Sequence, residues 1–256
     1  MIANYHTHTP RCHHAYASEE EFCQAAIDGG LKILGFSDHS PYYFPGDYYS
    51  NFRMDREQLE DYAQSVFACR DKYAHQLQVH LGVEAEFYPN EFAKTVDLLK
   101  SHGVEYMLLA MHFVHHEEGE LYSGRPSDSV QRLVGYCDWA IEALKTGLFT
   151  YFAHPDMLNF TGDQKLFDKH MRRLCRAVSE MNVPLEINLL GLTEGRNYPN
   201  PRFWRIAGEE GCKAIIGCDA HKLAMLPNLE NARKAENLAR EWGVELLETV
   251  QLKPLG

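Results

Sequence analysis

The sequence predicts an α/β fold in which about seven strand–helix units form a barrel. Short apolar segments alternate with longer amphipathic ones along the chain, and this order is typical of a parallel sheet. The chain has 256 residues, a common length for one barrel. The same units could lie open as a doubly wound sheet, but no GxGxxG follows the first strand, which disfavours its dinucleotide-binding form. No linker or change of composition interrupts the chain, so we expect one domain over residues 1–256.

The individual elements follow from short apolar runs and helix-capping residues. The predicted strands span residues 2–5, 31–37, 77–83, 106–111, 150–153, 184–188 and 214–218. The first helix starts with a capping box at residues 18–21 and ends at Gly29-Gly30. Later helices begin near Asp55, Asn90, Ser127, Asp163, Asn200 and Asn228. Residues 41–54 form a long, aromatic loop, and such a loop in a compact domain is often functional.

The composition limits the partners of the chain. The formal net charge is -11 and no block of lysine or arginine occurs, so nucleic acid is not an expected partner. The seven cysteines include no CxxC pair. Because there is also no signal peptide and no apolar run of membrane-spanning length, we expect a reduced, cytoplasmic protein that does not contact a membrane. The sequence carries no signal for the oligomeric state.

Histidines and carboxylates follow six of the seven predicted strands. In a parallel barrel these strand ends lie on one face, where active sites are built. Only the sixth strand lacks such a residue and offers Asn188, followed by a loop over residues 191–199. The residues at the other strand ends are His6, His8, Asp38, His39, Glu84, Glu86, His112, His154, Asp156, Asp219 and His221.

Any one of these residues alone could be a hydrogen-bonded polar group or a helix cap. Agreement at six strand ends favours a metal site. The candidate ligands are too many for one four-coordinate ion, so we predict two or three ions of the zinc, iron or manganese class. His13 and His14 compete for one ligand position, and spacing does not decide between them.

Seven pieces of the sequence, taken in order, resemble the PHP (polymerase and histidinol phosphatase) family of metal-dependent phosphoesterases. The pieces are "HTHTPRCHHA", "FSDHSP", "GVEAEF", "MHFV", "FAHPDM", "EINLLGL" and "GCDAH". The chain is most similar to the histidinol-phosphatase branch. The resemblance implies a distorted (β/α)7 TIM-like barrel, the PHP fold, with three divalent metal ions.

The resemblance also implies how the ligands are shared among the ions. One ion would be held by His6, His8, Glu84 and Asp219. Glu84 would bridge to a second ion, which is held also by His112 and His154. The third would be held by His14, His39 and His221. His14 is chosen over His13 because the family places its third N-terminal histidine six residues after the first pair. Asp219, His221 and Glu84 are the predicted catalytic residues.

The expected reaction is hydrolysis of a phosphate monoester by a phosphoric monoester hydrolase. L-histidinol phosphate would give L-histidinol and phosphate, in histidine biosynthesis, and a hydroxide bridging two ions would be the nucleophile. Asp219 and Asp156 are considered as proton donors to the leaving group. The small-molecule substrate would bind through Arg196 and Arg53, with Tyr42 beside its cationic part. Each arginine could equally form a surface salt bridge, and the aromatic loop could simply cover the barrel.

Two other functions remain open at this point. One is a PHP phosphoesterase that acts on another substrate, such as a nucleotide, a sugar phosphate or a phosphodiester. The other is a metal-binding module without catalysis. Every expected ligand position is filled, which disfavours the second of these alternatives.

Overall fold

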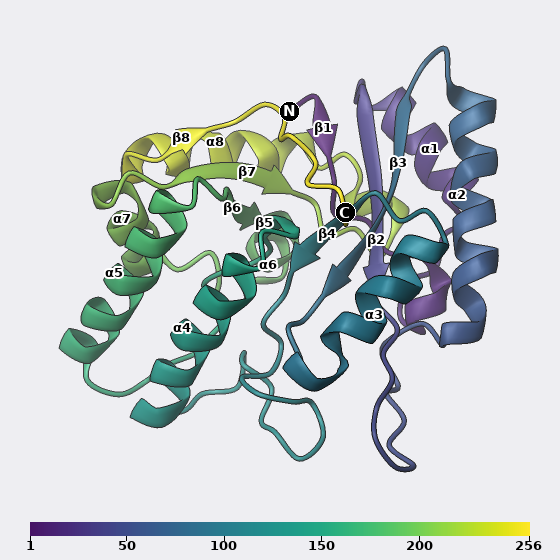
Figure 1. The fold of residues 1–256 in the computed structure, drawn as a ribbon. Coiled ribbons are helices and arrows are strands. Elements are labelled where there is room, and N and C mark those ends of the chain that lie inside the picture. The colour runs from purple at the N-terminus through teal and green to yellow at the C-terminus, as the bar shows by residue number, and fades with distance from the viewer.

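The computed structural model describes residues 1–256 and contains one sheet of eight parallel strands in sequence order. The sheet curls on itself and the helices lie around its outside (Figure 1). The predicted α/β barrel is therefore confirmed. The strands are β1 (Ala3–Asn4), β2 (Ile33–His39), β3 (Gln78–Ala85), β4 (Tyr106–Leu109), β5 (Phe149–Phe152), β6 (Leu185–Asn188), β7 (Lys213–Gly217) and β8 (Glu245–Leu246).

The helices alternate with the strands as the amphipathic segments predict. The capping box is present at Ser18, whose side chain and backbone both bond to Glu21. Asn200 caps its helix ahead of Pro201. None of the helices is long and apolar enough to cross a membrane. The helices are α1 (Glu19–Asp28), α2 (Leu59–Tyr73), α3 (Pro89–Ser101), α4 (Val130–Lys145), α5 (Gln164–Glu180), α6 (Leu189–Glu194), α7 (Pro201–Glu209) and α8 (Leu229–Trp242), with 3-10 turns η1 (Pro10–Cys12), η2 (Arg56–Gln58) and η3 (Leu223–Met225).

Two elements differ from the prediction. The sequence predicts seven strands, and the structure adds β8, a two-residue strand whose Glu245 and Leu246 pair with Lys213 and Ala214. It is too short to produce a periodic pattern. The residues after β6 are predicted as loop, but Asn188 caps the short helix α6, which ends at Gly195 with φ of 64°.

The barrel closes only at the carboxyl end of its strands. There, Thr7 and Ala220 form an isolated parallel bridge, with hydrogen bonds from His8 N to Ala220 O (2.9 Å) and from Ala220 N to His6 O (3.1 Å). At the other end of the barrel, β8 lies beside β7 instead. The segments that follow β1 and β7 are thus held together where the candidate ligands lie.

The interior of the barrel is filled at its amino end. Tyr106 donates hydrogen bonds to the carbonyls of Tyr5 (2.7 Å) and Phe36 (3.1 Å). Its ring occupies the space above Gly82, where a Cβ atom would come within 2.3 Å of it. A second group of apolar side chains packs here with the C-terminal segment: Ala3, Leu108, Tyr151, Ala153, Ile215, Leu247, Val250 and Leu252. The carboxyl end is left open for polar residues.

Candidate metal centre

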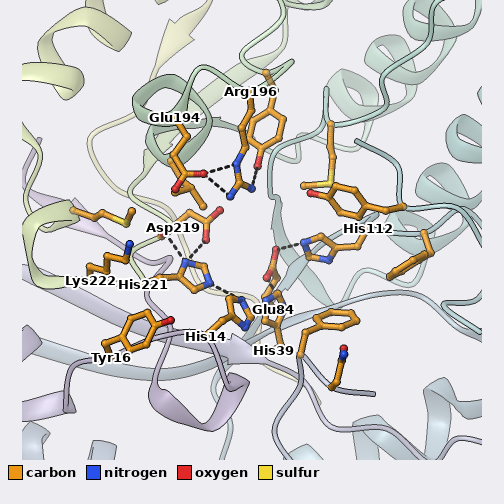
Figure 2. A pocket seen from close by; sticks show the side chains of 18 residues that line it. His14, Tyr16, His39, Glu84, His112, Glu194, Arg196, Asp219, His221 and Lys222 are labelled. Carbon is orange, nitrogen blue, oxygen red and sulfur yellow. Dashed lines mark hydrogen bonds and ion pairs between the residues drawn. The ribbon is translucent and has the colours of Figure 1, made fainter. Parts of the chain in front are cut away.

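A cavity of about 460 Å³ opens at the carboxyl ends of the strands. Two long connections, after β2 and after β4, project from this end of the barrel (Figure 1). Figure 2 shows Glu194 and Arg196 on one side of the cavity and histidines on the opposite side. Six of the nine predicted ligands line it: His14, His39, Glu84, His112, Asp219 and His221. The other three, His6, His8 and His154, lie buried beneath.

His6, His8 and Asp219 form the first ligand group. One donor atom from each lies within 4.8 Å of the others. His8 Nε2 is 3.1 Å and His6 Nε2 is 3.6 Å from Asp219 Oδ1. Asp219 has a positive φ of 51°, a backbone conformation that costs free energy in a non-glycine residue and is concentrated at functional sites.

Glu84 lies at the centre of the predicted ligands. Its Oε1 is 2.7 Å from His154 Nε2, 3.5 Å from His6 Nε2 and 3.7 Å from His112 Nε2. Its Oε2 is 3.0 Å from His39 Nδ1. A carboxylate with two oxygens directed to different histidines has the geometry of a bridging ligand.

His14, His39 and His221 form another group of three donors. His14 Nε2 and His221 Nε2 face each other at 3.0 Å. The Nδ1 atoms donate to backbone carbonyls, those of Cys12 (2.6 Å) and Asp219 (3.1 Å). Both Nε2 atoms therefore present lone pairs to the same point, which is favourable when a cation lies between them. His13 is exposed and belongs to none of these groups.

Three carboxylates support histidines from behind. His6 Nδ1 is 2.8 Å from Glu186 Oε1, His8 Nδ1 is 3.3 Å from Asp38 Oδ1, and His112 Nδ1 is 2.6 Å from Glu86 Oε1. A carboxylate on Nδ1 fixes the tautomer and turns Nε2 toward the site, as is usual for metal-binding histidines.

Glu186 is the main functional residue that the sequence reasoning missed. It lies within β6, is fully buried, and accepts hydrogen bonds from Tyr151 Oη (3.2 Å), His154 N (3.1 Å) and Asn188 Nδ2 (2.9 Å) besides His6. A charged residue inside a buried apolar strand is a usable signal. The candidate residues were taken only from the ends of the predicted strands, and Glu186 lies inside one.

The charges of the cluster fit divalent cations. Burial opposes ionisation of Glu84 and Asp219, yet the surrounding histidines hold the pKa of both carboxyls well below the usual range. Several buried nitrogen and oxygen atoms of the cluster lie close to one another but form no well-directed hydrogen bond: His6 Nε2, His8 Nε2, His39 Nδ1 and Glu84 Oε2. Imidazole and carboxylate groups with free lone pairs at this density are a donor set for divalent metal ions.

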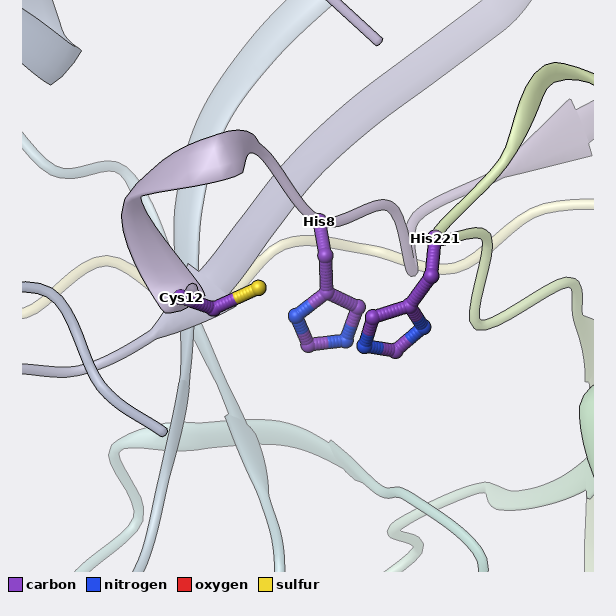
Figure 3. A group of neighbouring side chains, drawn as sticks. All are labelled: His8, Cys12 and His221. Atoms are coloured by element: carbon purple, nitrogen blue, oxygen red, sulfur yellow. The ribbon is translucent and has the colours of Figure 1, made fainter. Parts of the chain in front are cut away.

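Cys12 lies beside this cluster, with His8 and His221 (Figure 3). Its thiol donates to the carbonyl of Thr9 at 3.1 Å. Burial, together with nearby Asp38, raises the pKa of the thiol. Because its thiol is directed to the Thr9 carbonyl, Cys12 is not among the ligands that we infer.

Arg196 lines the cavity, as a substrate-binding residue should. Its Nη1 donates to Tyr198 Oη and its Nε to Glu194 Oε2, both at 2.8 Å. Tyr198 also lines the cavity. Its ring stands 5.8 Å from that of His154, so the guanidinium lies close to the candidate metal ligands.

The structure places Arg53 and Tyr42 away from the cavity, which corrects their predicted role. Arg53 is buried and paired with Glu86 and Glu117. Tyr42 is buried and donates to the carbonyl of Glu86 at 2.6 Å. Neither side chain lines the cavity. Both are held by contacts with glutamates of the loops that follow β3 and β4.

Asp156 is also held away from the cavity. It accepts a hydrogen bond from the indole of Trp204 at 3.0 Å and another from Asn200 N. Burial raises its pKa to about 7. Its contacts join the loop after β5 to the start of α7, which is a structural role.

The fold and the site together define a curled α/β barrel with a candidate divalent-metal centre at its carboxyl end. A family model described as the PHP domain matches residues 4–189. The chain therefore belongs to the PHP domain family.

Relatives within this family carry phosphatase names. A Deinococcus radiodurans protein named "Probable histidinol-phosphatase" is 29% identical over 229 residues, which cover 86% of each chain. An Aliivibrio fischeri protein named a probable phosphatase is 22% identical over 91% of this chain and 83% of its own. A solved structure of histidinol phosphate phosphatase from Lactococcus lactis, in complex with zinc, L-histidinol and phosphate, has a TM-score of 0.75. It is 17% identical and covers 98% of this chain and 97% of that chain, and shows that the two share a fold.

Proposed function

We propose that this protein is a metal-dependent phosphatase that hydrolyses L-histidinol phosphate to L-histidinol and phosphate. The observation that carries the proposal is the position of Arg196, which faces a cavity whose opposite side is made of histidines and carboxylates. This arrangement suits a phosphate monoester between cations. The name of the Deinococcus radiodurans relative supports the choice of substrate.

The centre would hold three divalent ions of the zinc, iron or manganese class. His6, His8, Glu84 and Asp219 would hold the first, Glu84, His112 and His154 the second, and His14, His39 and His221 the third. When bound, such ions lower the pKa of water and neutralise phosphate oxygens. Glu84, Asp219 and His221 also face the cavity, so they are the proposed catalytic residues that meet the reacting phosphate.

The remaining residues of the cavity would bind and orient the substrate. The guanidinium of Arg196 can donate two parallel hydrogen bonds to phosphate oxygens. Glu194 is the only acid lining the cavity outside the proposed metal ligands, and it is placed to accept from the ammonium group of histidinol. Phe52, Phe113 and Tyr122 line the same space and offer flat apolar surface to an imidazole ring.

A substrate screen on metal-reconstituted protein tests the proposal. We expect a kcat/KM on histidinol phosphate well above that on p-nitrophenyl phosphate, sugar phosphates, nucleotides and a phosphodiester. His154→Ala serves as the control for reactions that depend on the centre. Equal rates on histidinol phosphate and on the generic esters would reject this substrate and favour a phosphatase of another specificity, as for the relative from Aliivibrio fischeri that is named without a substrate.

Elemental analysis separates an enzyme from a metal-binding module. We expect three ions per chain, since the nine proposed ligands are all brought together. Fewer than two ions per chain, together with no turnover of any ester, would favour the non-catalytic alternative.

A further inference from the structure

A buried chain of hydrogen-bonded polar side chains runs from the candidate metal centre to the loops that follow β2 and β4. His112 Nδ1 is 2.6 Å from Glu86 Oε1. The other oxygen of Glu86 accepts from Arg53 Nη2. Arg53 Nε in turn donates to Glu117 Oε2 at 2.7 Å. The exposed fractions of Arg53, Glu86 and Glu117 are only 2%, 1% and 5%, so the chain is shielded from water along its length.

Within this row of buried side chains, Arg53 is the one cation that pairs with both Glu86 and Glu117. A guanidinium can use Nε and Nη2 in the same plane toward two acceptors, which the single ammonium of lysine cannot match. Removal of the arginine would leave Glu117 without a counter-ion and Glu86 with His112 alone, and an unpaired buried charge is strongly destabilising. The position of the Glu86 carboxylate therefore depends on Arg53.

The same arginine joins the two loops that surround the cavity. Arg53 belongs to the loop after β2, and Glu117 to the loop after β4, which also carries His112 and Tyr122 of the cavity wall. Phe52 lies against Arg53, with the guanidinium carbon 4.4 Å from its ring centre. The ring of Phe52 is 5.3 Å from that of His39.

Tyr42 supports the same glutamate from the same loop. Its hydroxyl donates to the backbone carbonyl of Glu86 at 2.6 Å. The loop after β2 thus forms two hydrogen bonds with Glu86, one to its carboxylate and one to its backbone carbonyl. This gives the long aromatic loop a function that a simple cover over the barrel would not need.

We propose that Arg53 is a positioning residue for the metal centre. It holds Glu86 so that the ring of His112 is turned with Nε2 toward Glu84, and with Glu117 it ties the two loops together at the wall of the cavity. The inference rests on the metal centre of the proposed function, and adds that the loop after β2 helps to set metal affinity. Removing a residue that supports a metal-binding histidine typically weakens metal binding by about 10–100-fold.

Competition with a chelator measures the effect without using activity. The dissociation constants of zinc from the centre are compared for the wild-type protein, Arg53→Lys, Arg53→Met and Arg56→Met. Arg56 is exposed in the neighbouring 3-10 turn, where its guanidinium lies over the ring of Tyr43, so it is the matched control. We expect one ion to bind about 10–100-fold more weakly in both Arg53 variants and no change in Arg56→Met. Wild-type affinity in Arg53→Lys and Arg53→Met would overturn the proposal.

A second variant separates positioning from simple stabilisation. Arg53→Met with Glu117→Met removes the carboxylate that Arg53→Met alone would leave without a counter-ion. We expect the melting temperature of the metal-free protein to recover toward that of the wild type while the zinc affinity stays low, because Glu86 still lacks the hydrogen bond from Arg53. Recovery of affinity together with melting temperature would show that Arg53 acts only through stability, contrary to the proposal. A wild-type protein that binds zinc but hydrolyses no phosphate ester would refute the proposed function, and the binding comparison would still decide the role of Arg53.

Discussion

At the scale of single residues, the carboxylates behind the histidines orient the rings of those histidines. Glu186 accepts from four donors: His6 Nδ1, Tyr151 Oη, His154 N and Asn188 Nδ2. A glutamine at this position has one oxygen, and its amide nitrogen would face other donors. The substitution keeps the shape of the side chain and breaks the hydrogen-bond pattern.

We therefore expect Glu186→Gln to weaken metal binding by about 10–100-fold. Chelator competition with zinc measures this directly. Glu180→Gln, at the exposed end of α5, is the control and should bind as the wild type does. An unchanged dissociation constant in Glu186→Gln would mean that the orientation of His6 does not depend on this carboxylate.

Glu194 provides a test of substrate recognition at the same scale. It pairs with Arg196 at 2.7 Å and its side chain is 41% exposed. A hydrogen bond to a charged group contributes about 1.5–3 kcal/mol, and this exposure places the effect at the lower end. We expect Glu194→Gln to lower kcat/KM for histidinol phosphate by about tenfold. Hydrolysis of p-nitrophenyl phosphate, which lacks an amine, should stay unchanged, and an equal loss on both esters would indicate that Glu194 acts only on Arg196.

At the scale of elements, the order of strands and helices could be predicted from the sequence, because each strand is a short apolar run and each long helix has an amphipathic pattern. The sequence also predicted which strand ends carry polar residues. It did not predict where side chains such as Arg53 point, since a long loop has no period from which to read orientation. Glu186 was missed for a different reason: it lies inside β6 and not beyond its end, and the alternation of Leu185 and Ile187 with it resembles an ordinary buried strand.

The packing of β3 and β4 gives a prediction at this scale. A Cβ atom at Gly82 would lie 2.3 Å from the ring of Tyr106, and one at Gly35 would lie 2.2 Å from its hydroxyl. The ring cannot shift without losing its bonds to Tyr5 and Phe36. We expect Gly82→Ala to lower the free energy of unfolding by about 1–3 kcal/mol, measured by urea denaturation. Lys169→Ala on the exposed face of α5 is the control. A Gly82→Ala protein as stable as the wild type would show that the barrel interior can expand here.

At the scale of the whole molecule, the metal centre and the closure of the barrel are the same region. Proposed ligands come from the ends of β1 to β5 and of β7. The segments after β1 and β7 are joined there by the bridge of Thr7 with Ala220 and by a backbone hydrogen bond from Tyr16 N to His221 O. Ions shared by His6, His8 and Asp219 would span this junction. The metal should therefore act as a closing element of the barrel as well as a part of its active site.

Removing the metal should consequently loosen one end of the barrel more than the other. We expect the amide hydrogens of His8 and Ala220, which bond to Ala220 O and His6 O, to exchange with solvent faster in chelator-treated protein than after zinc is restored. The amide of Leu247 bonds to Ala214 O at 2.7 Å, beside β8 at the opposite end, and is the internal control. Zinc at 100 times its dissociation constant should add about 2.7 kcal/mol to the free energy of unfolding, so the melting temperature should rise as well. Uniform protection of both ends by zinc would indicate that the ions stabilise the molecule globally and do not close the barrel locally.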